Sequence, residues 1–215
     1  MKENPVPRID DYIQSRALAV EELKAKSPSE VAARSQAKYE VRQGQEGLIL
    51  PYFGRPYWIG WPEVEVVYLE GEGEVNIQEQ ILMLHYLVTT QGKPLTGKTI
   101  DFRQVPAGEF YHSAFVQRAR VPLLKVFGHN LELYRQAAAM MGGVKLDLGD
   151  AAATYQALPL VPITHVLWQG DDEFEPEANI IFDESIVTHL ATEDVAALSG
   201  FSVYRLFGAA RKLQG

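Results

Sequence analysis

The segment that most constrains the fold is an apolar run in the C-terminal third of the chain. Val161–Trp168 places apolar residues on both faces of a strand, which is typical of a strand in the middle of a sheet. A second short apolar run, residues 178–182, follows after an acidic stretch. Two apolar runs of strand length joined by a polar loop favour a β-hairpin. We therefore expect a central strand paired with residues 178–182 across the loop 169–177.

The N-terminal part of the chain changes from a helical to a β pattern. Residues 10–37 carry a loose apolar stripe, and Ser27 followed by Pro28 predicts the start of a second short helix. Residues 39–69 mix tyrosine, phenylalanine and tryptophan with glycine and proline. Short β-prone runs between turn residues predict a meander of antiparallel strands.

The middle of the chain is dominated by helical patterns. Residues 76–91 predict the clearest helix, because Asn76 can accept a hydrogen bond from the first turn and apolar residues recur at helical spacing. The other expected elements are a strand over residues 98–105, two helices over 109–143 that break near Pro122 and Gly128, and a C-terminal helix capped by Thr192.

These elements together predict an α+β fold. We expect a mixed or antiparallel sheet, built from the aromatic-rich N-terminal meander and the C-terminal hairpin and packed by helices. A chain of 215 residues, 47% of them hydrophobic, can bury a sizeable core. We expect one domain over residues 1–215, with a helical arm over 1–37 and a core over 38–215.

Composition excludes several kinds of site. The chain has no cysteine, which excludes disulfides, thiolate metal sites and a cysteine nucleophile. Residues 1–8 lack the apolar segment of a signal peptide, and no apolar run approaches the roughly 18 residues of a membrane-spanning helix. We therefore expect a cytoplasmic protein that does not enter a membrane.

The negative charge is concentrated in one part of the chain. The net charge is −8, but residues 146–204 contain no Lys or Arg and eleven acids, so this stretch carries −11 and the remainder +3. Such a surface repels phosphate backbones, and we expect no nucleic-acid partner. A cation or a basic protein surface is the natural complement.

The acidic loop of the hairpin is the strongest candidate for chemistry. Asp172 and Glu173 lie in it, and Asp183 follows the second strand. Converging carboxylates attract hard cations, and we predict that these three, with Arg103 across a cleft, form a ligand or metal site. The alternative is a set of solvated acids on an exposed loop, in which Phe174 anchors the loop to the core.

Two glycine-rich patterns suggest nucleotides but stand in the wrong context. Residues 92–99 spell a phosphate loop, with Lys98 and Thr99 at its end. Such a loop requires a strand before it and a helix after it, whereas this one follows a helix and precedes a strand. We expect a plain turn and keep nucleotide binding there as the least favoured alternative. Gly71 and Gly73 resemble part of a dinucleotide fingerprint, but Asn76 occupies the third glycine position.

Histidine and tryptophan give weaker signals. The five histidines form no close metal-ligand pair in the sequence, and His85 and His165 stand in apolar segments where core positions are expected. Trp58, Trp61 and Trp168 are candidates for an aromatic platform that stacks on a ligand, with burial in the core as the alternative.

Several segments resemble a known family when they are taken together. They are residues 81–87, 92–103, 106–115, 158–162, 168–174 and 182–194. In combination they are similar to the uncharacterised family called domain of unknown function 3786, over about residues 75–210. The resemblance implies that Arg103, Gly108, Trp168, Asp172, Glu173 and Asp183 are family positions, without assigning a role to any of them.

The resemblance also implies a metabolic setting. The family is typical of anaerobic bacteria and archaea, and some members carry a fused iron–sulfur domain like that of corrinoid proteins in one-carbon metabolism. This chain has no cysteine to hold such a cluster. It also has Thr99 where the family pattern often has an aromatic residue, which argues against a magnesium-binding hydroxyl as a family feature.

Three hypotheses follow from the sequence. The first is an accessory module that binds a small cofactor or a partner from corrinoid or iron–sulfur metabolism. The second is an enzyme in which Asp172, Glu173 and Asp183 hold magnesium or manganese, with His112 or His165 as general base. The third is an interaction subunit that forms stable complexes and binds no small ligand.

Overall fold

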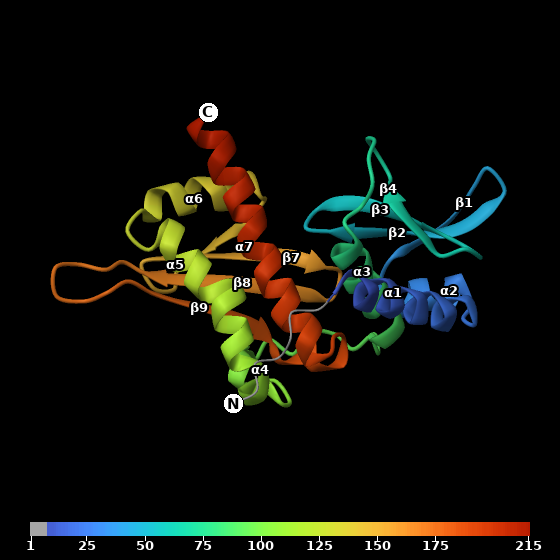
Figure 1. Cartoon of the computed structure of the whole chain (residues 1–215), viewed down its shortest axis with the longest axis horizontal. Coiled ribbons are helices and arrows are strands. Elements are labelled where there is room, and N and C mark those ends of the chain that lie inside the picture. The colour runs from blue at the N-terminus through green and yellow to red at the C-terminus, as the bar shows by residue number, and fades with distance from the viewer. Residues whose placement is uncertain (1–7) are drawn as a thin grey trace. The chain divides into compact units, whose positions relative to one another are not determined.

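A computed structural model describes residues 8–215 (Figure 1). The signal-peptide expectation and the first residues of the expected helical arm fall outside this range. The contacts of the chain divide it into two compact units. Unit 1 consists of the described residues up to Pro51 together with Arg55–Gly92, and unit 2 consists of Tyr52–Gly54 and Lys93–Gly215.

Unit 1 combines helices with a four-stranded meander. Its strands follow each other in the order β1-β2-β3-β4, with antiparallel pairing in the β1–β2 and β3–β4 pairs. The predicted aromatic-rich meander is therefore confirmed. The elements are α1 (Ile9–Lys24), α2 (Pro28–Ser35), β1 (Lys38–Arg42), β2 (Gln45–Tyr52), β3 (Arg55–Gly60), β4 (Glu65–Tyr68) and α3 (Ile77–Thr89).

The helices of unit 1 begin where the sequence places them. Pro28 is the first residue of α2 and Ser27 precedes it, although the Ser27 hydroxyl lies 2.8 Å from that of Ser29 and does not cap the helix. The Asn76 side chain accepts the Gln78 backbone N–H at 2.9 Å and caps α3. The apolar stripe of α3 is buried, and α1 lies against this helix.

Unit 2 is built on a five-stranded antiparallel sheet of order β5-β9-β8-β7-β6. Its central strand is β8, as predicted, and β9 pairs with it in a register that matches Trp168 with Glu177. The strands are β5 (Thr99–Asp101), β6 (Val144–Leu146), β7 (Ala151–Leu158), β8 (Val161–Trp168) and β9 (Glu177–Asp183). The predicted α+β class is confirmed, with the meander and the hairpin in separate sheets.

Helices cover one face of this sheet (Figure 1). They are α4 (Gly108–Phe115), α5 (Val121–Phe127), α6 (Leu131–Met140) and α7 (Thr192–Gln214), and the shorter segments are η1 (Phe102–Gln104), the π-helical η2 (Val116–Arg120) and η3 (Glu184–Thr188). His165 of β8 is fully buried beneath α7, and its Nε2 lies 2.8 Å from the Ser202 hydroxyl. Burial lowers the pKa of His165 to about 3, so this histidine is a neutral core residue that joins the sheet to α7.

Three boundaries differ from the sequence prediction. The strand expected over 98–105 ends at Asp101, because η1 begins at the next residue. Pro122 does not break the helix, since α4, η2 and α5 follow one another without interruption, and the π-helical turn rearranges the backbone hydrogen bonds where proline has no N–H. The residue that caps α7 is Ala191, while the Thr192 hydroxyl donates to the Pro106 carbonyl.

Within residues 8–215, no helix is both long enough and apolar enough to span a bilayer.

Candidate functional site

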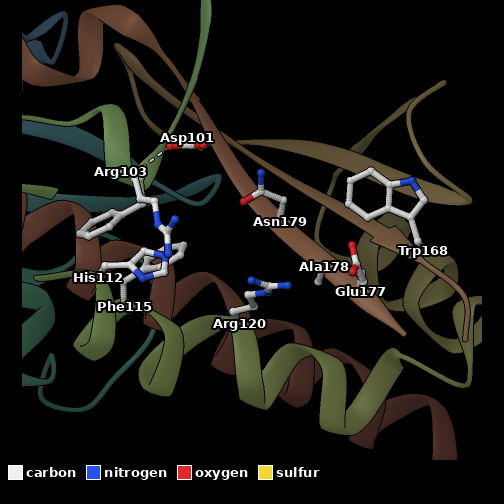
Figure 2. A pocket seen from close by; sticks show the side chains of 10 residues that line it. Asp101, Arg103, His112, Phe115, Arg120, Trp168, Glu177, Ala178 and Asn179 are labelled. Atoms are coloured by element: carbon white, nitrogen blue, oxygen red, sulfur yellow. Dashed lines mark hydrogen bonds between the residues drawn. The ribbon is translucent and has the colours of Figure 1, made fainter. Parts of the chain in front are cut away.

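A pocket of about 310 Å³ opens beside β9 in unit 2 (Figure 2). Its volume lies at the lower end of the range that is usual for small-molecule sites. The lining residues come from five elements and the end of a sixth: Asp101 of β5, Phe102 and Arg103 of η1, His112 and Phe115 of α4, Arg120 of η2, Trp168 at the end of β8, and Glu177, Ala178 and Asn179 of β9.

The pocket exists because β5 is short. Its last pair with β9 is Asp101↔Ile181. The Asp101 carboxylate then accepts the backbone N–H groups of Arg103 at 2.9 Å and Gln104 at 3.2 Å, which starts η1 and turns the chain away from the sheet. In the described part of the chain, residues 177–180 therefore have no strand beside them on this edge.

Asn179 protects this open edge against a further strand. The Glu184 N–H donates to the Lys98 carbonyl, so the even-numbered N–H groups of β9 point to the β5 side. The Ile180 N–H is one of them, and the side-chain oxygen of Asn179 accepts it at 2.9 Å. With that donor satisfied, one of the groups that an added strand would pair with is already occupied.

The basic side chains of the pocket have few hydrogen-bond or ion-pair partners within residues 8–215. Arg120 is half-buried, and neither its guanidinium nor the His112 ring forms a hydrogen bond or ion pair within residues 8–215. Arg103 has one ion pair, to Glu109 at 3.7 Å, between two exposed side chains, and such pairs contribute little. Arg120 and His112 therefore line the pocket without an acceptor in the described part of the chain.

Aromatic side chains form the floor and one end of the pocket. Phe102 and Phe115 stack in parallel with their ring centroids 4.3 Å apart, and both are buried. Trp168 lies at the far end, 41% exposed, and its indole approaches the backbone of Gly149 so closely that a Cβ there would lie 3.2 Å from it. The indole is thus supported on one side and accessible on the other.

The predicted acidic cluster is not assembled in the structure. Asp172 and Glu173 are exposed in the loop between β8 and β9, whereas Asp183 lies at the opposite end of β9, about 20 Å away at the rise of a strand. Arg103 lies in the pocket and contacts none of the three. No group of three or more His, Asp or Glu that could hold a metal occurs in residues 8–215.

The hairpin loop is organised by its own backbone. The Asp171 carboxylate accepts the N–H groups of Glu173 at 2.9 Å and Phe174 at 2.8 Å, and these bonds hold the pKa of Asp171 below its usual range. Phe174 is 69% exposed, so it does not anchor the loop to the core as expected.

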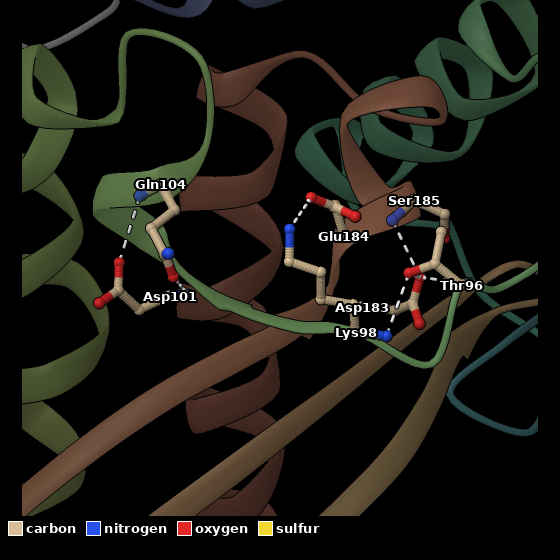
Figure 3. Close-up of polar contacts among 7 residues, drawn as sticks. All are labelled: Thr96, Lys98, Asp101, Gln104, Asp183, Glu184 and Ser185. Atoms are coloured by element: carbon tan, nitrogen blue, oxygen red, sulfur yellow. Dashed lines mark hydrogen bonds and ion pairs between the residues drawn. The ribbon is translucent and has the colours of Figure 1, made fainter.

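Asp183 fills the turn that resembles a phosphate loop (Figure 3). Its carboxylate accepts the backbone N–H groups of Thr96 at 3.0 Å, Gly97 at 2.7 Å and Ser185 at 2.9 Å. Partial burial raises the pKa of this carboxyl, but the hydrogen bonds from Thr96, Ser185 and Gly97 outweigh it and hold the pKa at about 2. Lys98, the residue that would contact a phosphate, pairs with Glu184 at 2.6 Å. The protein's own carboxylate therefore occupies the anion position.

The three tryptophans are divided between the two units. Trp58 and Trp61 belong to unit 1 and Trp168 to unit 2. Trp61 is only 6% exposed and its indole N–H donates to the Leu23 carbonyl at 3.3 Å, which identifies it as a core residue. Trp58 is half-buried, with the Arg42 guanidinium 5.6 Å from its ring centroid. Trp168 alone lines the pocket beside β9.

Sequence reasoning found part of this pocket. The sequence predicts Arg103 and His112 at the acidic cluster and Trp168 in an aromatic platform, and it does not single out Arg120 or Asn179. One signal points to Arg120: it lies two residues before a proline inside a helical pattern. Such a proline favours an irregular turn, and π-helical turns are frequent at functional sites.

Comparison with known proteins places the chain in a family. Residues 27–205 match the family described as domain of unknown function (DUF3786). The chain belongs to this family. The match extends further toward the N-terminus than the resemblance over residues 75–210 and includes the meander of unit 1. No curated protein and no solved structure matches the chain.

Proposed function

We propose that unit 2 is a binding module for a small organic anion, whose carboxylate or phosphate group is held between Arg120 and Arg103. The observation that carries the proposal is the half-buried Arg120 guanidinium, which lines the pocket without an acceptor in the described part of the chain (Figure 2). A guanidinium offers a planar fork of donors that matches carboxylate and phosphate oxygens.

The local charge supports an anion despite the net charge of −8. Of the two acids that line the pocket, Asp101 already accepts two backbone N–H groups. The other, Glu177, lies next to Trp168 in the register of the sheet and so at the far end of the pocket. His112 and the Asn179 side chain add further polar groups near the two arginines. The pocket therefore offers more donors than free acceptors between Arg103 and Arg120.

This role corresponds to the small-ligand form of the accessory module that the sequence suggested. The association with corrinoid or iron–sulfur metabolism rests on the family resemblance and stays a prediction. The metal-dependent alternative gains no support, because Asp172 and Asp183 lie at opposite ends of β9 and residues 8–215 contain no ligand cluster.

The test compares two arginines of the same helical segment. Arg120→Met removes the guanidinium that lines the pocket and keeps much of the side-chain volume, whereas Arg118→Met removes an exposed guanidinium two residues away. The full chain would be titrated calorimetrically with inorganic phosphate, sugar phosphates and mono-, di- and tricarboxylates. We expect at least one anion to bind, R120M to weaken it at least tenfold, and R118M to change it less than twofold.

Two outcomes would overturn the proposal. One is that no anion of the panel binds or stabilises the wild-type protein. The other is that R120M binds the same anion as tightly as R118M does, which would place the anion elsewhere on the molecule.

A further inference from the structure

The end of the pocket away from Arg103 has a different chemistry. Trp168 and Glu177 are direct partners in the antiparallel ladder between β8 and β9, so their side chains project on the same face with Cβ atoms about 5 Å apart. The Glu177 side chain is exposed and has no hydrogen bond or ion pair among residues 8–215. An accessible indole and a free carboxylate thus stand side by side.

The register of β9 gives the distance between the two ends. Glu177, Asn179 and Ile181 alternate along the same face of the strand, and Ile181 pairs with Asp101, where η1 begins. Four residues at about 3.3 Å each separate the Glu177 position from that of Ile181 by about 13 Å. Figure 2 shows Asn179 between Trp168 on one side and Arg103 on the other. The pocket is therefore elongated, with an anion-binding end and an aromatic, acceptor-bearing end.

We propose that the ligand carries an amino-bearing heteroaromatic ring at one end and a phosphate at the other, the chemistry of a purine nucleoside monophosphate. This inference rests on the proposed function, because it places the phosphate at Arg103 and Arg120. The ring stacks on the accessible face of Trp168, and Glu177 accepts hydrogen bonds from the amino edge of the ring.

The structure favours a monophosphate over a triphosphate. Arg103 of η1 and Arg120, which Figure 2 draws between Arg103 and Glu177, together match the charge of one phosphate. Triphosphate sites add a magnesium ion held by acidic residues or a phosphate-binding loop. The described residues contain no acidic group of that kind, and the N–H groups of Thr96 and Gly97 are occupied by Asp183.

Four probes separate the two ends of the ligand. They are guanosine monophosphate, inosine monophosphate, ribose 5-phosphate and inorganic phosphate, each titrated calorimetrically into the full chain. Guanosine monophosphate should bind at least tenfold more tightly than inosine monophosphate, which lacks the amino group, and both should exceed ribose 5-phosphate, which lacks the ring.

Variants assign these preferences to residues. Glu177→Met, which removes the acceptor, should reduce the preference for the amino group to less than twofold, while Glu175→Met, a change at another exposed acid nearby, should leave it unchanged. Trp168→Leu should weaken guanosine monophosphate at least fivefold without affecting ribose 5-phosphate, and Trp168→Phe should restore most of the affinity because it keeps a ring.

The outcomes distinguish this inference from the proposed function. Equal affinity for ribose 5-phosphate and guanosine monophosphate would overturn the ring and leave the anion site standing. Insensitivity of guanosine monophosphate binding to both W168L and E177M would likewise overturn it. Failure of all four probes, together with every carboxylate of the wider panel, would overturn the anion site itself.

Discussion

The turn at Asp183 and the pocket beside β9 differ in how their hydrogen-bond donors are satisfied. At the Asp183 end, the N–H groups of Thr96, Gly97 and Ser185 all donate to one carboxylate of the protein. In the pocket, the donors of Arg120 and His112 have no acceptor in the described range. The first arrangement stabilises the fold, and the second leaves binding energy for a ligand. A motif that looks like an anion site and a pocket able to bind an anion thus lie beside the same strand but satisfy their donors differently.

The largest effect on stability is expected from removing the carboxylate of Asp183. Asp183→Ala leaves three backbone N–H groups without their acceptor, and we expect the free energy of unfolding to fall by about 2–3 kcal/mol in urea denaturation. Asp172→Ala, at an exposed loop position, should change it by less than about 0.5 kcal/mol. Equal stability of the two variants would show that Asp183 does not hold the turn.

In the pocket, by contrast, a substitution should change ligand binding and not stability. Arg120→Met removes no internal hydrogen bond among residues 8–215, so we expect its unfolding free energy to stay within about 0.5 kcal/mol of wild type. Its anion affinity should fall at least tenfold, which corresponds to about 1.4 kcal/mol. A variant that loses stability but binds the anion normally would identify Arg120 as a structural residue. It would also remove the contrast between the pocket and the Asp183 turn.

Acid should remove the stabilising contribution of the Asp183 carboxylate over a defined pH range. The pKa of Asp183 is about 2 in the folded protein and 3.8 ordinarily, so its contribution is fully present above pH 4 and is lost as the pH falls toward 2. We expect the stability difference between wild type and Asp183→Asn to shrink by about 1 kcal/mol over this range, allowing for solvent screening. Urea titrations at pH 5 and pH 2 measure it, and a difference independent of pH would contradict this account.

The smallest effect is expected at the lysine of the phosphate-loop pattern. Lys98 and Glu184 form an ion pair at 2.6 Å between exposed side chains, and exposed pairs contribute about 0–1 kcal/mol. Lys98→Met should therefore lower the unfolding free energy by about 0.5 kcal/mol and leave anion affinity unchanged. A tenfold loss of anion affinity in this variant would restore the nucleotide site at residues 92–99.

Local signals in the sequence predicted the elements that depend on neighbouring residues. The β8–β9 hairpin follows from two apolar runs and a polar loop, and α3 follows from Asn76 and its apolar spacing. The context of residues 92–99 argued correctly for a turn. That Asp183 fills this turn was not predictable, because the two segments are 86 and 87 residues apart in sequence and meet only through the β5–β9 pairing.

The pocket was harder to predict for the same physical reason. Arg103, Arg120, Trp168 and Asn179 lie on four separate elements, and none of them forms a spacing pattern with another. Arg118 and Arg120 look equivalent in the sequence, and only the fold makes one exposed and places the other in the pocket. The acidic loop was predicted as a ligand or metal site because a run of charges is visible in the local sequence. An exposed hairpin loop explains the same run.

One titration tests the pocket and the Asp183 turn together. Inorganic phosphate added to ¹⁵N-labelled wild-type protein would be followed by amide chemical shifts, with R120M as the control. We expect saturable shifts around Arg103, Arg120 and Asn179 that disappear in R120M, while Thr96, Gly97 and Lys98 stay unchanged. Shifts confined to Thr96–Lys98, or shifts near β9 that persist in R120M, would contradict it.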